Sequence, residues 1–217
     1  RPSFINQTEL SYNFQPLVDF TLAYAQVTDL MTETIRIEDG IYYSQQGNLG
    51  SLKTMNVTLN VTYSPIKKLT LIGHAAMHYL HTKSTIFGQQ MDTKGTFIIA
   101  RPTLTYRPSE KWTFQVDGDY QGGQKFAQFS MRERTRVNFA INFKMNAGCS
   151  FNLAINDIFH SDINAGEISY LAGTYATFST LRDSRTANLS FRYRFTKGTK
   201  NDRSYQGGGA QSEQQRT

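Results

Sequence analysis

The sequence predicts an all-β fold, an antiparallel up-and-down β-barrel of the kind that spans an outer membrane. Apolar and polar residues alternate in many segments, the connections are alternately very short and long, and aromatic residues stand at strand ends beside the short turns. Alternation with a period of two indicates strands rather than helices. Short turns alternating with long loops, between strands of about ten residues, are typical of outer-membrane barrels.

The N-terminal half contains the clearest of these strands. Residues 9–14 form a short alternating run, and residues 18–30 follow after a tight turn. Over residues 55–63, Met, Val, Leu, Val and Tyr alternate with Asn, Thr, Asn and Thr. A second tight turn leads into residues 69–79, which alternate in the same way. Each run is predicted to be a strand with one apolar and one polar face.

The C-terminal half continues this pattern in further alternating segments, which brings the total to about nine strands. These segments are residues 97–106, 112–120, 137–143, 151–155 and 189–195.

Longer polar connections separate the hairpins, and we expect them to be outer loops. The last of them is expected to carry extended strand ends. If the protein is a receptor, these stretches would face its substrate, and no individual substrate-binding residue is predicted within them. The stretches are Met31 to Leu49, Thr82 to Gly95, Gln121 to Arg132 and Phe159 to Asp183.

Composition narrows the class of protein. The chain has 217 residues, which is enough for one domain with a real core. No stretch approaches the roughly 20 apolar residues of a spanning helix, which excludes a helical membrane protein. The net charge of +6 is assigned to a basic tail and to scattered Arg and Lys. Outside the tail the sequence shows no clustered basic face, so nucleic acid is not expected as a partner.

A soluble β-sandwich that serves as a binding module would also show alternation. Two observations favour the barrel. The polar face is rich in Asn, Thr and Gln rather than Lys and Glu, which suits a wet lumen. The aromatic residues beside the short turns fall on one side, as an interfacial girdle would. They are Phe14, Tyr63, Tyr106, Phe143 and Phe195.

Histidines and the single cysteine are the first candidates for chemistry. His74 and His78 lie four apart and share a strand face, whereas His81 lies on the other face. Four residues of strand span roughly 13 Å, too far for two ligands of one ion. Cys149 stands alone just after a tight turn and is interpreted as an ordinary strand residue. No metal site and no cofactor is predicted.

Charged residues on predicted strands are the second group of candidates. Asp117 and Asp119 are two apart, roughly 6.6 Å, which resembles a pair of catalytic carboxylates. Nothing else supports hydrolysis, and we interpret them as solvated lumen residues. Arg132, Arg134 and Arg136 are expected to line one strand face near an outer loop. A site for an anionic substrate is the alternative to unspecific lumenal charge. No catalytic residue is predicted, and the protein is not expected to be an enzyme.

Several stretches together carry a resemblance to a known family. Thr8 to Phe14 lead into a strand ending near Thr28-Asp29, and Pro-containing turns occur within 62–70 and 105–113. The Asn156 to His160 stretch is similar to an Asp-Ile-Phe-Asn box, with His160 in place of Asn. Ser184 to Phe195 is similar to a terminal strand with its aromatic insertion signal. The chain thus resembles the C-terminal β-barrel region of Bacteroidetes-type TonB-dependent outer-membrane receptors.

The resemblance implies an organisation and a set of partners. Residues 1–196 would be an outer-membrane β-barrel segment, and residues 197–217 a disordered polar tail in the periplasm. Because the chain begins at Arg1 without an initiator Met or a signal-peptide pattern, we expect it to be the C-terminal portion of a barrel of roughly 22 strands.

The partners implied are outer-membrane lipid, a nutrient (a siderophore, a glycan or a peptide), a surface lipoprotein, and the TonB complex acting through N-terminal regions absent from this sequence. The alternatives are a complete small barrel, either structural or adhesin-like, that does not transport, and the soluble β-sandwich.

Overall fold

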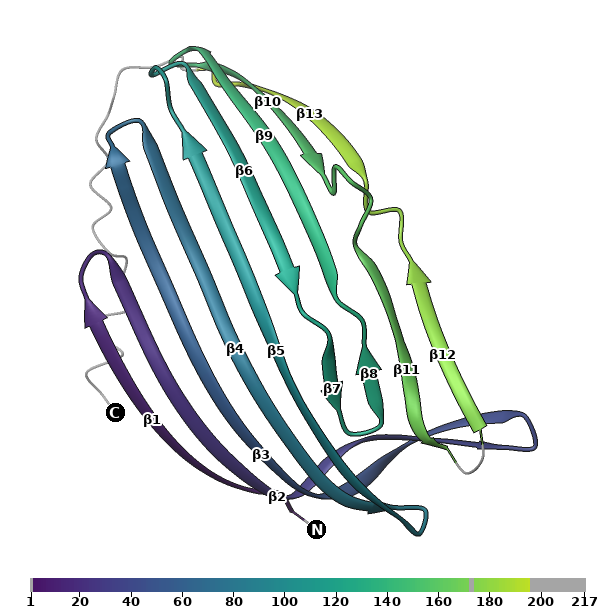
Figure 1. The fold of residues 1–217 in the computed structure, drawn as a ribbon. Coiled ribbons are helices and arrows are strands. Elements are labelled where there is room, and N and C mark those ends of the chain that lie inside the picture. Colours follow the sequence, from purple (N-terminus) through teal and green to yellow (C-terminus); the bar gives the residue numbers. More distant parts are fainter. Residues whose placement is uncertain (1, 172–173, 196–217) are drawn as a thin grey trace, which may run out of the picture.

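The structure, a computed structural model, describes residues 2–171 and 174–195, and this part of the chain is almost entirely β-strand (Figure 1). The predicted all-β class is therefore confirmed. No helix in the described residues is both long enough and apolar enough to cross a membrane. The strands are β1 (Phe4–Phe14), β2 (Val18–Glu38), β3 (Ile41–Ile66), β4 (Leu69–Ile86), β5 (Gln89–Tyr106), β6 (Trp112–Gln121), β7 (Gln124–Phe126), β8 (Phe129–Met131), β9 (Arg134–Asn146), β10 (Cys149–Asn156), β11 (Ile163–Leu171), β12 (Thr174–Leu181) and β13 (Thr186–Tyr193).

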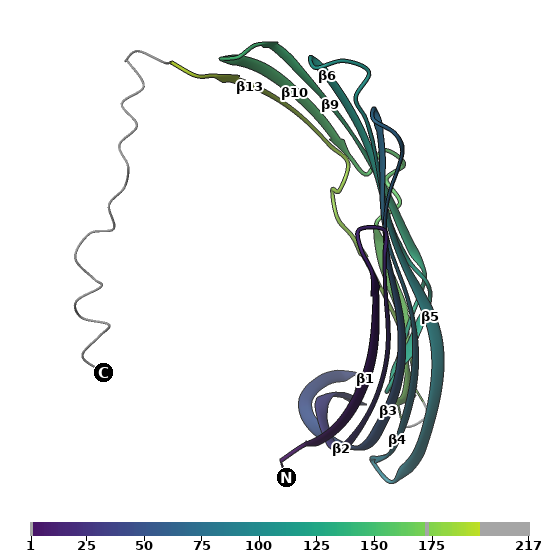
Figure 2. The ribbon, with the colours of Figure 1, turned by 90° about the vertical axis from the view of Figure 1, so that its left-hand side faces the viewer.

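Nine of these strands form one antiparallel sheet in the order β1-β2-β3-β4-β5-β6-β9-β10-β13. The sheet curves across its width and has a concave side, as the view along its edge shows (Figure 2). It is not closed into a ring in the described residues, because β1 and β13 each pair with one neighbour. This is the expected barrel wall, and the expected number of about nine strands is confirmed.

The strand registers place most of the large apolar residues of the nine strands on one face. One row across the first five strands pairs Leu10 with Leu22, Leu22 with Val57, Val57 with Met77, and Met77 with Ile98. Most of these side chains are exposed, since no other described residue covers them. We call this face the apolar band.

Aromatic residues lie at the short-turn end of the apolar band, as predicted. Phe14 pairs with Val18 and Tyr63 with Leu71, and Tyr106 and Phe143 take equivalent places on β5 and β9. Phe195 lies just beyond the end of β13 rather than within a strand.

The outer connections were predicted to be loops, and this is wrong for most of their length. β2 and β3 continue as a paired hairpin to a turn at Asp39-Gly40, and β4 and β5 continue to a turn at Phe87-Gly88. All four turn residues have positive φ, the conformation of the tight hairpin turns that suit strand twist. These extensions have no single apolar face, so their sequence lacks the alternation on which the strand prediction depended.

The third and fourth predicted loops also contain strands. β7 and β8 lie within Gln121 to Arg132, and β11 and β12 lie within Phe159 to Asp183. They form a second antiparallel sheet in the order β12-β11-β8-β7, beyond the ends of β6, β9 and β10 (Figure 1). We call it the outer sheet.

The far part of the β2–β3 hairpin, residues 30–48, bends out of the wall, and we call it the arm. The bend occurs where Asp29 and Gly50 both have positive φ and the pairing skips from Thr28–Ser51 to Leu30–Leu49. A Cβ atom on Gly50 would lie 2.4 Å from the carbonyl oxygen of Lys83. Only glycine fits this place, and the bend carries the arm to the concave side of the wall (Figure 2).

Candidate functional site

The face opposite the apolar band carries polar side chains that pair across the strands. His74 Nδ1 lies 2.8 Å from Asn60 Oδ1, and His78 Nδ1 lies 2.8 Å from Asn56 Oδ1. Arm residue Leu30 packs against Ile86 and Met91, which lie on this same side of β4 and β5. Since the arm lies on the concave side, the polar face is the concave one. The two histidines share it, as predicted, and each is satisfied by an asparagine.

An alternating cluster of arginines and aspartates lies on the polar face near the outer sheet. Asp119 accepts from Arg101 Nε at 3.3 Å and lies 3.6 Å from Arg136 Nη2. Asp162 lies 3.3 Å from Arg136 Nη1 and 3.6 Å from Arg134 Nη1. Because all of these side chains are partly exposed, each pair contributes at most about 1 kcal/mol to stability. The cluster joins β5, β6 and β9 to the connection that follows β10.

The structure tests the prediction that Arg132, Arg134 and Arg136 line one strand face. Arg134 and Arg136 lie on the polar face of β9, but Arg132 precedes that strand, and its backbone N–H donates to the Ala165 carbonyl at 2.8 Å. The prediction of three arginines on one strand face is therefore wrong for Arg132. Its backbone continues the pairing of β8 with β11 in the outer sheet.

The two aspartates of β6 have different partners. Asn138 Nδ2 donates to Asp117 Oδ2 at 2.6 Å, whereas Asp119 forms ion pairs with Arg101 and Arg136. In the part of the chain that the structure describes, their side-chain partners are Gln115 and Asn138 for Asp117, and Arg101 and Arg136 for Asp119. A recess of about 450 Å³ next to the cluster is lined by Arg136, Asn138 and Asn156 among others. It is polar and suits a hydrogen-bonding solute.

A buried glutamine joins the arm to the outer sheet. Gln128, in the turn between β7 and β8, is only 1% exposed. Its Oε1 accepts from the Ile35 backbone N–H at 2.8 Å, and its Nε2 donates to the Ile35 carbonyl at 3.0 Å and to the Ser169 carbonyl at 3.3 Å. The side-chain amide thus pairs with an arm peptide as a neighbouring strand would.

An apolar cluster surrounds this clamp. Ile35 is fully buried and Ile168 is 6% exposed, and Phe129 and Phe178 pack against them. The stretch that was expected to face the substrate therefore contains the residue that anchors the arm. Sequence reasoning missed Gln128, because a glutamine in a polar connection carries no signal of burial.

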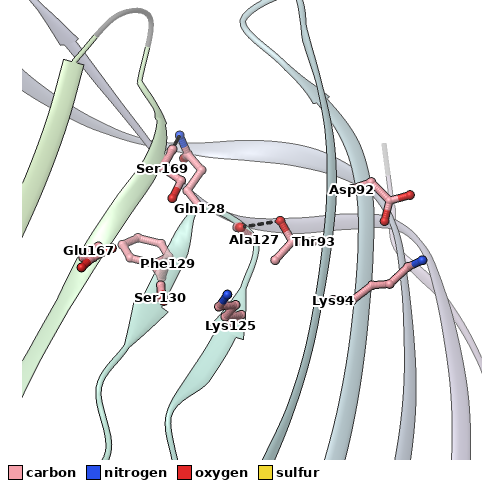
Figure 3. Close-up of a pocket in the computed structure, with 10 residues that line it drawn as sticks. All are labelled: Asp92, Thr93, Lys94, Lys125, Ala127, Gln128, Phe129, Ser130, Glu167 and Ser169. Carbon is pink, nitrogen blue, oxygen red and sulfur yellow. Dashed lines mark hydrogen bonds between the residues drawn. The ribbon is translucent and has the colours of Figure 1, made fainter.

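An open recess of about 290 Å³ lies beside Gln128, where β5 meets the outer sheet (Figure 3). Thr93 and Lys94 come from β5, Lys125 from β7 and Glu167 from β11. Thr93 Oγ1 donates to the Ala127 carbonyl at 3.1 Å across this junction. The lining offers donors, acceptors and both signs of charge, which suits a polar ligand rather than an apolar one.

A buried aspartate organises the connection that follows β10. Asp157 has positive φ and is fully buried, and its carboxylate accepts from the Ser161 and Asp162 backbone N–H groups at 2.9 and 3.1 Å. Ser184, just before β13, donates its hydroxyl to the same carboxylate at 2.5 Å. Burial raises the pKa of Asp157, but these hydrogen bonds outweigh burial and leave its pKa below the ordinary value.

The hydrogen bond from Ser184 to Asp157 joins two of the stretches that carry the family resemblance. Asp157 belongs to the Asn156 to His160 stretch, and Ser184 opens the stretch that contains β13. Their hydrogen bond brings the chain back to β10 after the outer sheet, so that Asn156 can pair with Thr186. The role of Asp157 is to hold a turn, and the contact with Ser184 could not be read from either stretch alone.

His81 and Cys149 are the remaining residues that the sequence singled out. His81 lies on the opposite face from His74 and His78, as predicted, and its Nε2 lies 2.8 Å from Asp92 Oδ1. Cys149 begins β10 and is buried and unpaired. Among the described residues, no three His, Cys, Asp or Glu side chains lie close enough to hold a metal ion.

Comparison with known families agrees with this architecture. The model of the outer membrane protein beta-barrel family matches residues 1–193. The chain belongs to this family. No match was found among curated proteins or among solved structures. As an outer-membrane barrel protein, it places the apolar band against lipid and the concave polar face toward the lumen.

The dimensions of the apolar band fit this placement. Along β4 the band runs from Leu69 to Tyr79, and its last row also contains Tyr24 and Met55. Ten residues at about 3.4 Å each, tilted by about 40°, span roughly 26 Å, close to the apolar height of outer-membrane barrels. Tyr24 and Tyr79 form a second aromatic edge at the end opposite the short turns.

Proposed function

We propose that this chain is the C-terminal part of a TonB-dependent receptor that imports a nutrient across the outer membrane. The observation that carries the proposal is the open sheet, with lipid on one face and a hydrogen-bonded polar wall on the other. In lipid, the unpaired backbone of β1 and β13 requires further strands. A barrel of roughly 22 strands, the size that holds a plug, would supply them.

The proposed orientation places the short turns in the periplasm and the long hairpins outside the cell. Outer-membrane barrels have short periplasmic turns and longer extracellular connections, and the chain shows this asymmetry. The arm, the outer sheet and the two recesses would then form part of the extracellular mouth. A siderophore, a glycan or a peptide would bind there, and a surface lipoprotein could cover it. Residues 197–217 would lie in the periplasm; they are outside the described residues.

The reading frame upstream of Arg1 tests the proposal most directly. We expect it to encode a signal peptide, a plug domain and a dozen or so further strands. The full-length protein should then bind the purified periplasmic domain of its energy-coupling protein, and deletion of the plug's N-terminal segment should abolish that binding. A signal peptide placed directly before Arg1 would contradict the transport proposal.

That outcome would favour the alternative, a small barrel or adhesin-like surface protein that does not transport. The large outer surface formed by the arm and the outer sheet suits such a role. Ile41 and Tyr42 at the arm's tip are both 55% exposed, as residues of a contact surface would be. In that case, the edges of β1 and β13 would have to pair with each other or with a second copy of the chain.

A further inference from the structure

A row of basic residues crosses three strands immediately beyond the apolar band. The last row of the band pairs Met55 with Tyr79 and Tyr79 with Thr96. In the next row, Lys53 pairs with His81 and His81 with Lys94.

One row further, Ser51 pairs with Lys83 and Lys83 with Asp92. We call Lys53, His81, Lys83 and Lys94 the basic rim. The sequence shows no clustered basic face here, because these residues are far apart along the chain and only strand pairing gathers them.

The basic rim faces the same way as the apolar band. Residues two apart on a strand share a face, so Lys53 continues the face of Met55, and His81 continues that of Tyr79. The side chains between them point the other way and are covered: Leu52 is 9% exposed and Thr82 is fully buried. The lysines, by contrast, are exposed. A membrane around the apolar band would therefore meet the basic rim at its surface.

The charges of the basic rim do not cancel. Among the described residues, Asp92 is the one carboxylate that shares its rows, and it lies 2.8 Å from His81 Nε2 and 3.7 Å from Lys83 Nζ. The hydrogen bond from His81 lowers the pKa of Asp92, so this carboxylate is ionised at neutral pH. Three lysines against one aspartate leave two positive charges. Within the described part of the chain, Lys53 and Lys94 have no ion-pair partner.

The spacing of the lysines fits a phosphate group. Neighbouring strands are about 4.8 Å apart, so Lys53 and Lys94 lie about 10 Å apart at the backbone, with Lys83 diagonal to them. Their long, flexible side chains can bring three ammonium groups together on one group of oxygens. The rim also lies at the right height, because one row beyond the band rises about 5 Å, from hydrocarbon into the headgroup layer.

We propose that Lys53, Lys83 and Lys94 form a lipid-binding site that holds the phosphate groups of a glycolipid in the membrane leaflet at the long-hairpin end. The acyl chains of that lipid would lie along the apolar band below, against Tyr79, Met77 and Ile98. The site follows from the outer-membrane family and the strand registers, and it does not require transport. Only the assignment to the outer leaflet rests on the orientation proposed above.

Binding of purified lipid A, a phosphorylated glycolipid, to the full-length protein in neutral detergent micelles tests the site. The site variant is Lys53→Gln/Lys83→Gln/Lys94→Gln. The matched control, Lys67→Gln/Lys68→Gln/Lys111→Gln, removes the same charge at the short turns. Attraction of each lysine to an anionic lipid surface changes affinity roughly fivefold. We therefore expect the site variant to bind on the order of 100-fold more weakly and the control variant to bind within about twofold of the unchanged protein.

Two further probes identify what is recognised. Dephosphorylated lipid A should bind the unchanged protein and the site variant equally, and inorganic phosphate at millimolar concentration should not displace lipid A. Equal losses in the two variants, no loss in either, or displacement by inorganic phosphate would each overturn the proposal. Native mass spectrometry measures the amount of bound lipid. A heat-dependent change in mobility on gel electrophoresis confirms that each variant is folded.

A separate experiment distinguishes failure of the orientation from failure of the site. A cysteine introduced as Gln90→Cys lies beyond the basic rim on β5, at an exposed position. A membrane-impermeant maleimide should label it on intact cells. If the cysteine is not labelled and lipid A binding is unchanged, the basic rim faces the inner leaflet. That result would overturn the proposed orientation but not the phosphate site.

Discussion

The wall and the outer sheet are both antiparallel β-structure, yet they are held together in different ways. In the wall, nine strands repeat one rule, with apolar residues on one face and polar residues on the other. A slip of one residue would turn a whole strand's apolar set toward the lumen, so lipid specifies the register strongly. The arm and the outer sheet depend instead on a few residues, chiefly Gly50, Ile35, Gln128 and Ile168.

This difference teaches where single residues matter. Many wall positions are interchangeable provided that polarity is kept, because the solvent on each side enforces the pattern. The arm has no such enforcement, and its place is decided by one tight backbone approach and one buried amide. Substitutions should therefore act by face in the wall and by individual contact in the outer part.

The largest effect is expected when a charge is placed on the lipid face. Leu59 lies near the middle of the apolar band, and Thr58 beside it faces the lumen. Leu59→Arg should lower the free energy of unfolding by about 2–4 kcal/mol, since the charge must enter hydrocarbon. Thr58→Arg is the matched control and should change it little. Urea titration in lipid vesicles measures both, and equal costs would contradict the assignment of faces.

The next effect is expected at the bend of the arm. In Gly50→Val, the new Cβ atom would collide with the Lys83 carbonyl oxygen, and the valine would have to adopt the positive φ of 31° that Gly50 has. Strain of about 1–3 kcal/mol should release the arm and leave the wall folded. Gly73→Ala, where a Cβ atom has open space, is the control. Limited proteolysis should cleave the arm in the first variant alone; an intact, protected arm in Gly50→Val would show that the bend is not required.

A smaller effect is expected at the clamp. Gln128→Leu keeps the bulk of the side chain but leaves the N–H and carbonyl of buried Ile35 without their partner. The arm should lose about 1–3 kcal/mol of local stability. Hydrogen exchange of the Ile35 amide should accelerate accordingly, while amides of β4 keep their rates. Gln89→Leu, at an exposed position near a hairpin turn, serves as the control and should leave exchange at Ile35 unchanged.

The smallest effect concerns acid pH. The pKa of Asp157 is lower in the folded protein than in the unfolded chain, so ionised Asp157 stabilises the fold. That contribution is present in full above the unfolded value, near pH 4, and is lost as the pH falls through the folded value. Asp157→Asn should be less stable than the unchanged protein at pH 7 and approach it at pH 3. Parallel pH profiles of the two proteins would exclude this role.

How well the sequence predicts the strands of a segment depends on what surrounds that segment. Alternation over residues 55–63 and 69–79 located strands in the wall, because lipid and lumen demand opposite side chains there. Beyond the membrane both faces of β2 and β3 meet water or protein, and alternation fades, so residues 31–49 were expected to form a loop. The Asp39-Gly40 pair, a strong hairpin signal, was the clue in the sequence that indicated otherwise.

By itself, the sequence determined the all-β class, the two faces of the wall, the short turns and the aromatic edge at those turns. These follow from local alternation, which each strand carries independently of its neighbours. The tertiary structure alone decided the outer sheet, the inward bend of the arm, the bond from Ser184 to Asp157 and the gathering of Lys53, Lys83 and Lys94. Each of these joins residues distant along the chain, and only strand pairing and close packing bring such residues together.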